Sequence, residues 1–217
     1  MISAVVFDFD GVLSDSEPLH LRAYQQVLAD RGANLSAGEY YARYLGFDDE
    51  NVFRVFAADQ GWSISEEQIA ELIVQKSQAL EAMIARGEVL FPGAARCVAR
   101  MAATFPLGIA SGSLVHEIEG ILARAELRRH FRFIVGSGDT PRSKPAPDPY
   151  ALAARLHGLA PQACAAVEDS RWGIESAKGA GLRCIAITHT YPASELALAD
   201  VVIGTLDELT PALVRGL

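Results

Sequence analysis

The chain has 217 residues, half of them hydrophobic, which is enough for an α/β domain that carries a smaller insertion. Its formal net charge of −8 argues against nucleic acid as a partner, and no apolar stretch is long enough to cross a membrane. Met1 leads directly into an apolar run without a secretory signal pattern, and three scattered cysteines lack a metal-binding spacing, so we expect a cytoplasmic protein with reduced thiols.

The first predicted element is a buried strand over the apolar run Ile2–Phe7, which leads into the segment FDFDGVLSDSE. Alternation along a strand would place the side chains of Asp8 and Asp10 on one face, and Gly11 would let the backbone turn as the strand ends. Two adjacent carboxylates repel each other unless a cation holds them. The segment therefore predicts a cation site, with a solvated turn as the open alternative.

Calcium does not suit this segment. An EF-hand loop also contains Asp-x-Asp, but it needs further oxygen ligands and a closing Glu within about twelve residues. Val12 and Leu13 stand where such a loop requires oxygen atoms. Calcium is therefore disfavoured as the cation beside Asp8 and Asp10.

A long helical segment follows, from about residue 15 to about residue 87, and it is too long to be a single crossover between strands. It begins with a predicted helix over Leu19–Arg31 and ends with one over Glu66–Arg86. Between them, Ser36 with Glu39 and Ser65 with Gln68 have the spacing of capping boxes. We predict an inserted helical domain, hinged at about residues 14–18 and 86–92.

The rest of the chain alternates short apolar runs with helical patterns, which is typical of a parallel sheet covered on both faces. The candidate strands are Ala4–Phe7, Leu107–Ala110, Phe133–Val135, Ala165–Val167, Cys184–Ile187 and Val201–Ile203. The candidate helices are Gly93–Ala103, Leu114–Ala125, Pro149–His157 and Gly173–Ala180. Asp148 is a predicted N-cap, and Gly158 a predicted helix end. Ligands of such folds bind beyond the carboxyl ends of the strands, where Asp8 and Asp10 would lie.

Three further groups follow predicted strands. Ser111 and Gly112 form a small, hydroxyl-bearing turn that can bind an anion, Lys144 precedes a proline-rich turn, and Glu168 with Asp169 follows another strand. Taken singly, the serine turn could be an ordinary loop and the lysine a solvated charge. The two acids could simply stand at the start of a helix that Ser170 caps. Because their charges are complementary and all stand at strand ends, we interpret them as one site.

These segments identify a family resemblance that covers almost the whole chain. In order, FDFDGVLSDSE, IASGS, SKPAPDPY and VEDSRWGIESAKGAG resemble the four motifs of the haloacid dehalogenase superfamily, in its branch of β-phosphoglucomutases and phosphoglycolate phosphatases. The resemblance implies a Rossmann-like α/β core over residues 1–14 and 88–217. It also implies that residues 15–87 form an α-helical (C1) cap domain.

The resemblance also implies a role for each motif residue. Asp8 would be the nucleophile and Asp10 the general acid and base. The phosphoryl group would be bound by Ser111, Gly112 and Lys144. The implied cofactor is Mg²⁺, held directly or through water by Asp8, the Asp10 carbonyl, Glu168 and Asp169.

The implied reaction is hydrolysis of a phosphate monoester of a small metabolite through an aspartyl phosphate. Asp10 excludes dehalogenation, because a leaving halide needs no proton. A β-phosphoglucomutase-like phosphotransferase remains an alternative, since His20 and Lys76 stand where mutases have groups that face the substrate, although each could be an ordinary helix residue. Against it, Leu45 and Asp49 replace the cations that would grip a second phosphate, and residues 15–87 contain 12 acidic against 6 basic residues.

A more distant alternative is a phospholigand-binding protein without activity, which the presence of both aspartates disfavours. We expect the partner to be a small phosphorylated metabolite. We also expect a monomer, because a cap must open and close over its substrate.

Overall fold

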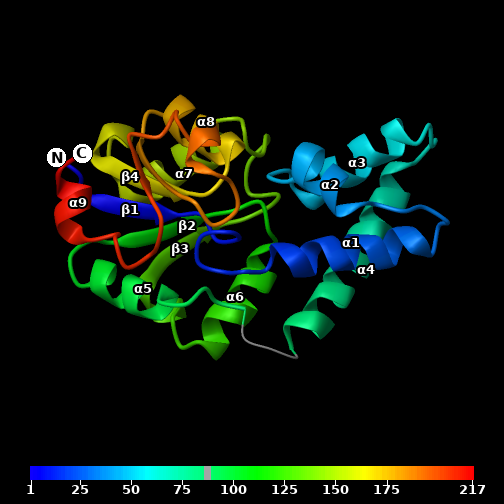
Figure 1. The fold of residues 1–217 in the computed structure, drawn as a ribbon, viewed down its shortest axis with the longest axis horizontal. Helices are drawn as coiled ribbons and strands as arrows, with labels where there is room; N and C mark the ends of the chain where they lie inside the picture. Colours follow the sequence, from blue (N-terminus) through cyan, green and yellow to red (C-terminus); the bar gives the residue numbers. More distant parts are fainter. Residues whose placement is uncertain (86–88) are drawn as a thin grey trace. The chain divides into compact units, whose positions relative to one another are not determined.

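The computed structural model describes residues 1–85 and 89–217, which divide into two compact units (Figure 1). The core unit comprises Met1–Asp15 and Leu90–Leu217, and the inserted unit comprises Ser16–Val89. The predicted end of the last inserted helix at Arg86, and part of the predicted hinge, lie outside the described residues.

The core unit contains a six-stranded parallel sheet in the order β3-β2-β1-β4-β5-β6, which confirms the predicted Rossmann-like α/β fold. The strands are β1 (Ala4–Phe7), β2 (Leu107–Ala110), β3 (Phe131–Val135), β4 (Cys164–Glu168), β5 (Arg183–Ile187) and β6 (Val201–Ile203). All four residues of β1 are fully buried, as expected of a central parallel strand covered on both faces. The strand order reverses between β1 and β4, so the switch point lies where β1 ends.

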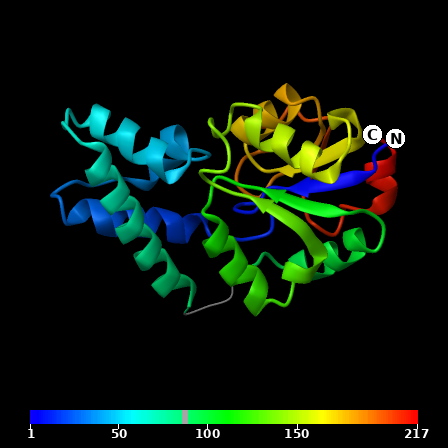
Figure 2. The same cartoon turned by 180° about the vertical axis from the view of Figure 1, so that it is seen from behind.

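Helices cover both faces of the sheet. On one face lie α7 (Asp148–His157) and α8 (Arg171–Gly179), and on the other lie α5 (Ala94–Ala102) and α6 (Val115–Arg124) (Figures 1 and 2). The short helix α9 (Pro211–Arg215) ends the chain, and 3₁₀ turns occupy Arg128–His130, Pro161–Ala163 and Ala193–Glu195. Buried residues of α7 and α8, among them Tyr150 and Ile174, pack on β1 and β4 through residues such as Val6 and Ala166.

The structure corrects two sequence predictions near the site. Glu168 is the last residue of β4 rather than a residue that follows the strand. Asp148 is not a side-chain cap of α7: its carboxylate accepts a hydrogen bond from Arg142 (Nη2 to Oδ2, 2.8 Å), so the guanidinium takes the place of the backbone donors. Gly158 ends α7 with φ +70°, as predicted.

The inserted unit is helical. It contains α1 (Glu17–Ala29), α2 (Ala37–Glu39), a π-helical turn η1 (Tyr40–Tyr44), α3 (Asp49–Asp59) and α4 (Glu66–Ile84). Both predicted capping boxes are present, at Ser36 with Glu39 and at Ser65 with Gln68. The long helix α4 packs against α1 and α3. No helix within residues 1–85 and 89–217 is long and apolar enough to span a membrane.

Candidate active site

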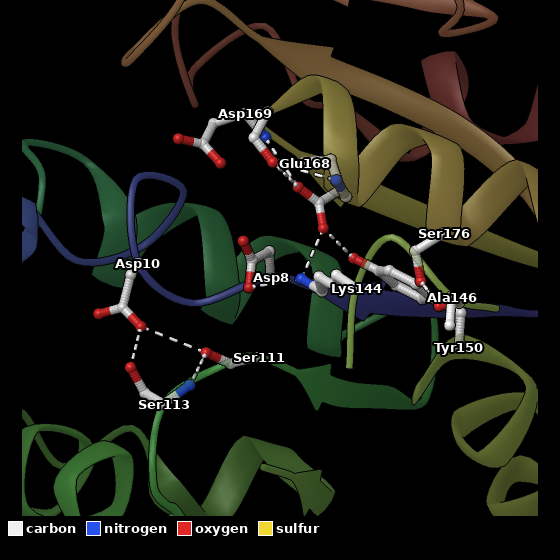
Figure 3. Close-up of polar contacts among 12 residues, drawn as sticks. Asp8, Asp10, Ser111, Ser113, Lys144, Ala146, Tyr150, Glu168, Asp169 and Ser176 are labelled. Atoms are coloured by element: carbon white, nitrogen blue, oxygen red, sulfur yellow. Dashed lines mark hydrogen bonds and ion pairs between the residues drawn. The ribbon is translucent and has the colours of Figure 1, made fainter. Parts of the chain in front are cut away.

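The candidate site lies where β1 and β4 end (Figure 3). The strand β1 stops at Phe7, and the backbone N–H of Asp8 donates to the Val167 carbonyl (2.8 Å), which fixes Asp8 beside β4. Gly11 then turns the chain with φ +76°. A Cβ on Gly11 would lie 1.9 Å from Oδ2 of Asp169, so only glycine lets the loop pass this close to the acid.

The two aspartates of the first motif bind different partners. Because β1 ends at Phe7, Asp8 and Asp10 lie in the loop that follows the strand. Figure 3 shows the carboxylate of Asp8 beside Lys144 and that of Asp10 beside two serines. The loop therefore presents two carboxylates with separate surroundings.

Lys144 joins two of the predicted acids. Its Nζ lies 2.9 Å from Oδ1 of Asp8 and 2.6 Å from Oε1 of Glu168, and its side chain is 4% exposed. Burial alone lowers the pKa of Lys144, but the carboxylates of Asp8 and Glu168 outweigh that effect and hold its pKa above the usual value. The lysine is thus a permanent buried cation at the end of β1.

The surroundings of Asp8, unlike those of Lys144, disfavour its charged form. Burial and the neighbouring Glu168 carboxylate raise the pKa of Asp8 well above its usual value, while Lys144 acts to lower it. One ammonium group is therefore too little positive charge to offset the repulsion and desolvation that Asp8 experiences here. A further cation would stabilise its ionised form.

The acids themselves form a group that can hold such a cation. Carboxylate oxygens of Asp8, Glu168 and Asp169 all lie within 4.8 Å of one another, and all three residues are buried. Hard oxygen donors of this kind suit Mg²⁺, which usually binds one or two carboxylates directly and keeps several waters. The carboxylate of Asp10 does not belong to this group among the described residues; its predicted contribution was the carbonyl.

Glu168 is held from several sides. Its Oε2 accepts from the backbone N–H of Asp169 (3.3 Å) and the hydroxyl of Ser170 (3.4 Å). Ser170 also caps α8, as predicted, by accepting from the N–H of Gly173 (3.1 Å). A Cβ on Gly173 would lie 1.9–2.0 Å from the Glu168 carboxylate, so the first turn of α8 leaves room for the acid only because this residue is glycine.

The turn after β2 contacts Asp10. Oδ2 of Asp10 accepts hydrogen bonds from the hydroxyls of Ser113 (2.6 Å) and Ser111 (3.2 Å), and both serines are buried. The backbone N–H of Ser113 donates to the Ser111 hydroxyl (3.1 Å), with Gly112 between them. Ser113 was missing from the predicted site residues, although the repeated hydroxyl of Ser-Gly-Ser was a signal for it.

His189 is a second residue that was missing from the predicted site. Its Nδ1–H donates to the carbonyl of Gly11 (3.0 Å), and its ring stacks on that of Phe91 with centroids 4.0 Å apart. Burial lowers the pKa of His189. The residue follows β5 and supports the loop that bears both aspartates, but no pattern in the sequence brings residues 11 and 189 together.

The inserted unit brings His20 and Lys76 together. Lys76 is fully buried, and its Nζ lies 2.9 Å from Oδ1 of Asp49 and 3.0 Å from Nδ1 of His20. The same Asp49 oxygen accepts from the Tyr24 hydroxyl at 2.5 Å. The alternative that Lys76 lies on a solvated helix face is therefore wrong, because a buried acid partner compensates the charge that burial would otherwise penalise.

Similarity to known proteins covers almost the whole chain. Residues 2–181 match the family model described as haloacid dehalogenase-like hydrolase. Hexitol phosphatase B of Escherichia coli (strain K12) is 34% identical over 213 residues, which cover 96% of this chain and 95% of that protein.

Solved structures agree with this match. The crystal structure of CbbY from Rhodobacter sphaeroides in complex with phosphate is 30% identical, covers 100% of both chains and has a TM-score of 0.89. A second CbbY structure, at 30% identity, 96% coverage of both chains and a TM-score of 0.87, contains xylulose-1,5-bisphosphate. A β-phosphoglucomutase from Clostridium difficile has a TM-score of 0.90 over 100% of this chain and 96% of that one, but at 20% identity it shows the fold alone.

Proposed function

The chain belongs to the haloacid dehalogenase-like hydrolase family, and we propose that it is a Mg²⁺-dependent phosphatase that acts on a small phosphorylated metabolite through an aspartyl phosphate. The observation that carries the proposal is the buried ion pair of Asp8 with Lys144, beside the acids Glu168 and Asp169. This arrangement offers a nucleophilic carboxylate, a fixed cation and a set of metal ligands at one strand end. The similarity to hexitol phosphatase B and CbbY supports a sugar phosphate or a related monoester as the substrate.

Asp8 would act as the nucleophile. One of its carboxylate oxygens attacks phosphorus, and the bond between phosphorus and the alkoxide oxygen of the substrate breaks. Lys144 already lies against Oδ1 of Asp8, so its ammonium group is positioned to stabilise charge on the phosphoryl oxygens during the transfer. Bound Mg²⁺, held by Asp8, the Asp10 carbonyl, Glu168 and Asp169, would supply positive charge that offsets the repulsion between these acids and a phosphate dianion.

Asp10 would move the protons. As a carboxylic acid it donates a proton to the leaving alkoxide, and as a carboxylate it then takes one from the water that attacks the aspartyl phosphate. Cleavage of the bond between phosphorus and the Asp8 oxygen releases inorganic phosphate and restores Asp8. The hydroxyls of Ser111 and Ser113 support this role, because they orient the Asp10 carboxylate through Oδ2.

We assign the substrate-selecting role to the inserted unit, within the predicted cap of residues 15–87, with residues 1–14 and 88–217 as the catalytic core. The buried cation of this unit, Lys76, is already paired with Asp49, which favours a substrate with a hydroxyl-rich body over one with a second phosphate. The substrate-side roles predicted for His20 and Lys76 belong to this assignment.

The direct test is release of inorganic phosphate from a panel of metabolite monoesters, with and without Mg²⁺. We expect Mg²⁺-dependent turnover that Asp8→Asn abolishes, together with fluoroberyllate binding, while the fold persists. An active Asp8→Asn protein would refute the nucleophile. Conversion of a hexose 1-phosphate with no net phosphate release would indicate the phosphotransferase, and phosphate-ester binding without turnover would indicate the non-catalytic protein.

A further inference from the structure

Tyr150 contacts the proposed catalytic residues from behind. It lies in the first turn of α7, is fully buried, and donates its hydroxyl to Oε1 of Glu168 at 2.6 Å (Figure 3). This is the oxygen that also receives the ammonium group of Lys144 at 2.6 Å. The same ammonium lies 5.1 Å from the centroid of the Tyr150 ring.

We propose that Tyr150 is a positioning residue of the phosphatase reaction: its hydroxyl holds Glu168 in the orientation from which Lys144 reaches Asp8. The inference rests on the proposed function, because it assumes that Asp8 receives the phosphoryl group. Tyr150 acts through Glu168 and would itself contact neither the substrate nor the phosphate.

One oxygen of the Glu168 carboxylate, Oε1, has two hydrogen-bond donors. Glu168 is fully buried, and the donors at Oε1 are Lys144 and the Tyr150 hydroxyl. Without the hydroxyl, Oε1 would depend on the ammonium group alone, and Glu168 would compete more strongly with Asp8 for Lys144. Displacements well below 1 Å are enough to impair catalysis by an oriented group.

The hydroxyl, rather than the ring, carries this effect. The phenol hydroxyl donates directly to Oε1 of Glu168, and phenylalanine would lack this donor. The ring packs in the core between α7 and the sheet, a contact that phenylalanine would preserve. The backbone beyond Lys144 is fixed separately, since the Ser176 hydroxyl donates to the Ala146 carbonyl at 2.6 Å.

A similar arrangement occurs in the inserted unit, where Tyr24 and Lys76 converge on one oxygen of Asp49 and Lys76 lies 5.2 Å from the Tyr24 ring centroid. In that unit the arrangement compensates the charge of the buried Lys76. At Lys144 the ammonium has an additional carboxylate partner, Asp8, and this extra partner is what gives the hydroxyl of Tyr150 its effect on the reaction.

The test is Tyr150→Phe, with Thr205→Val as the control in the same unit. The Thr205 hydroxyl also donates to a carboxylate (Oε1 of Glu208, 3.1 Å), but it follows β6 at the edge of the sheet and does not belong to the proposed site. On the substrate that the wild-type protein hydrolyses fastest, we expect Tyr150→Phe to lower kcat about tenfold, equivalent to about 1.4 kcal/mol, with KM within about twofold. Thr205→Val should leave kcat and KM unchanged. Both constants are measured per folded molecule, well below the melting temperature of each variant.

The outcomes separate the two proposals. If the wild-type protein hydrolyses no ester, the proposed function fails; if it does and Tyr150→Phe has the wild-type kcat, the positioning role fails. A crystal structure of the wild-type protein with fluoroberyllate gives a measurement that does not depend on the variant folding. It should retain the bond between Tyr150 and Glu168, and a tyrosine hydroxyl bonded elsewhere would overturn the inference.

Discussion

Replacing Gly173 with alanine should disable the site while leaving the helix that contains it in place. Gly173 lies in the first turn of α8, directly beside the carboxylate of Glu168. In an ordinary helix this substitution stabilises the protein by up to about 1 kcal/mol, because alanine is the better helix former. Here a methyl group would enter the space that the acid occupies.

The expected magnitude follows from the contacts of Glu168. The added Cβ would lie 1.9–2.0 Å from the carboxylate, against 3.4–4 Å for ordinary contact, so the acid must move by roughly 1.5 Å. Such a movement breaks its hydrogen bonds to Lys144 and Tyr150, which are worth about 1.5–3 kcal/mol each. After the gain in helix propensity, we expect a net destabilisation of about 2–5 kcal/mol and a loss of kcat of at least about 100-fold.

Two matched substitutions separate the steric effect from helix propensity. Gly179→Ala is in the same helix, where the added Cβ would meet Pro147 at 3.6 Å, and Gly120→Ala is in α6, where nothing lies within 4 Å. Both should leave kcat unchanged, and Gly120→Ala should gain about 0.5–1 kcal/mol. The assays are urea unfolding and phosphate release. A Gly173→Ala protein with normal kcat and raised stability would refute the reasoning.

Three further predictions concern other parts of the chain. Ser113→Ala should lower kcat about tenfold with little change in stability, because Asp10 loses its shorter hydroxyl contact; phosphate release measures this, and an unchanged kcat would contradict it. Lys76→Met should destabilise the protein by about 3–5 kcal/mol in urea unfolding, since Asp49 remains buried without its cation, and adding Asp49→Asn should recover part of the loss. Burial lowers the pKa of His157 to about 4. As the pH falls below about 6.5, this histidine is therefore protonated in the unfolded chain before it is protonated in the folded protein, and the free energy of unfolding should decrease by about 1 kcal/mol between about pH 7.5 and about pH 5.5. His157→Gln should remove that part of the pH dependence of thermal unfolding, and an identical pH dependence in the variant would exclude His157 as its source.

Sequence patterns predicted the structure correctly where the interactions join residues close together in the chain. The capping boxes at Ser36 and Ser65, the glycine at the end of α7 and the buried run of β1 each depend on residues a few positions apart, and each was predicted from the sequence. The parallel sheet followed from alternating strands and helices, because parallel neighbours need such crossovers. The Asp148 cap failed because Arg142, a neighbour with a long side chain, competed for the carboxylate.

The sequence by itself determined the fold class and the motif residues, because strand ends, turn glycines and charged groups can be recognised within short segments of the chain. Only the tertiary structure decided what those residues contact: that Lys144 lies between Asp8 and Glu168, and that Tyr150 shares an oxygen of Glu168 with it. These contacts depend on which strands become neighbours and on the space that Gly173 leaves, so no spacing along the chain encodes them.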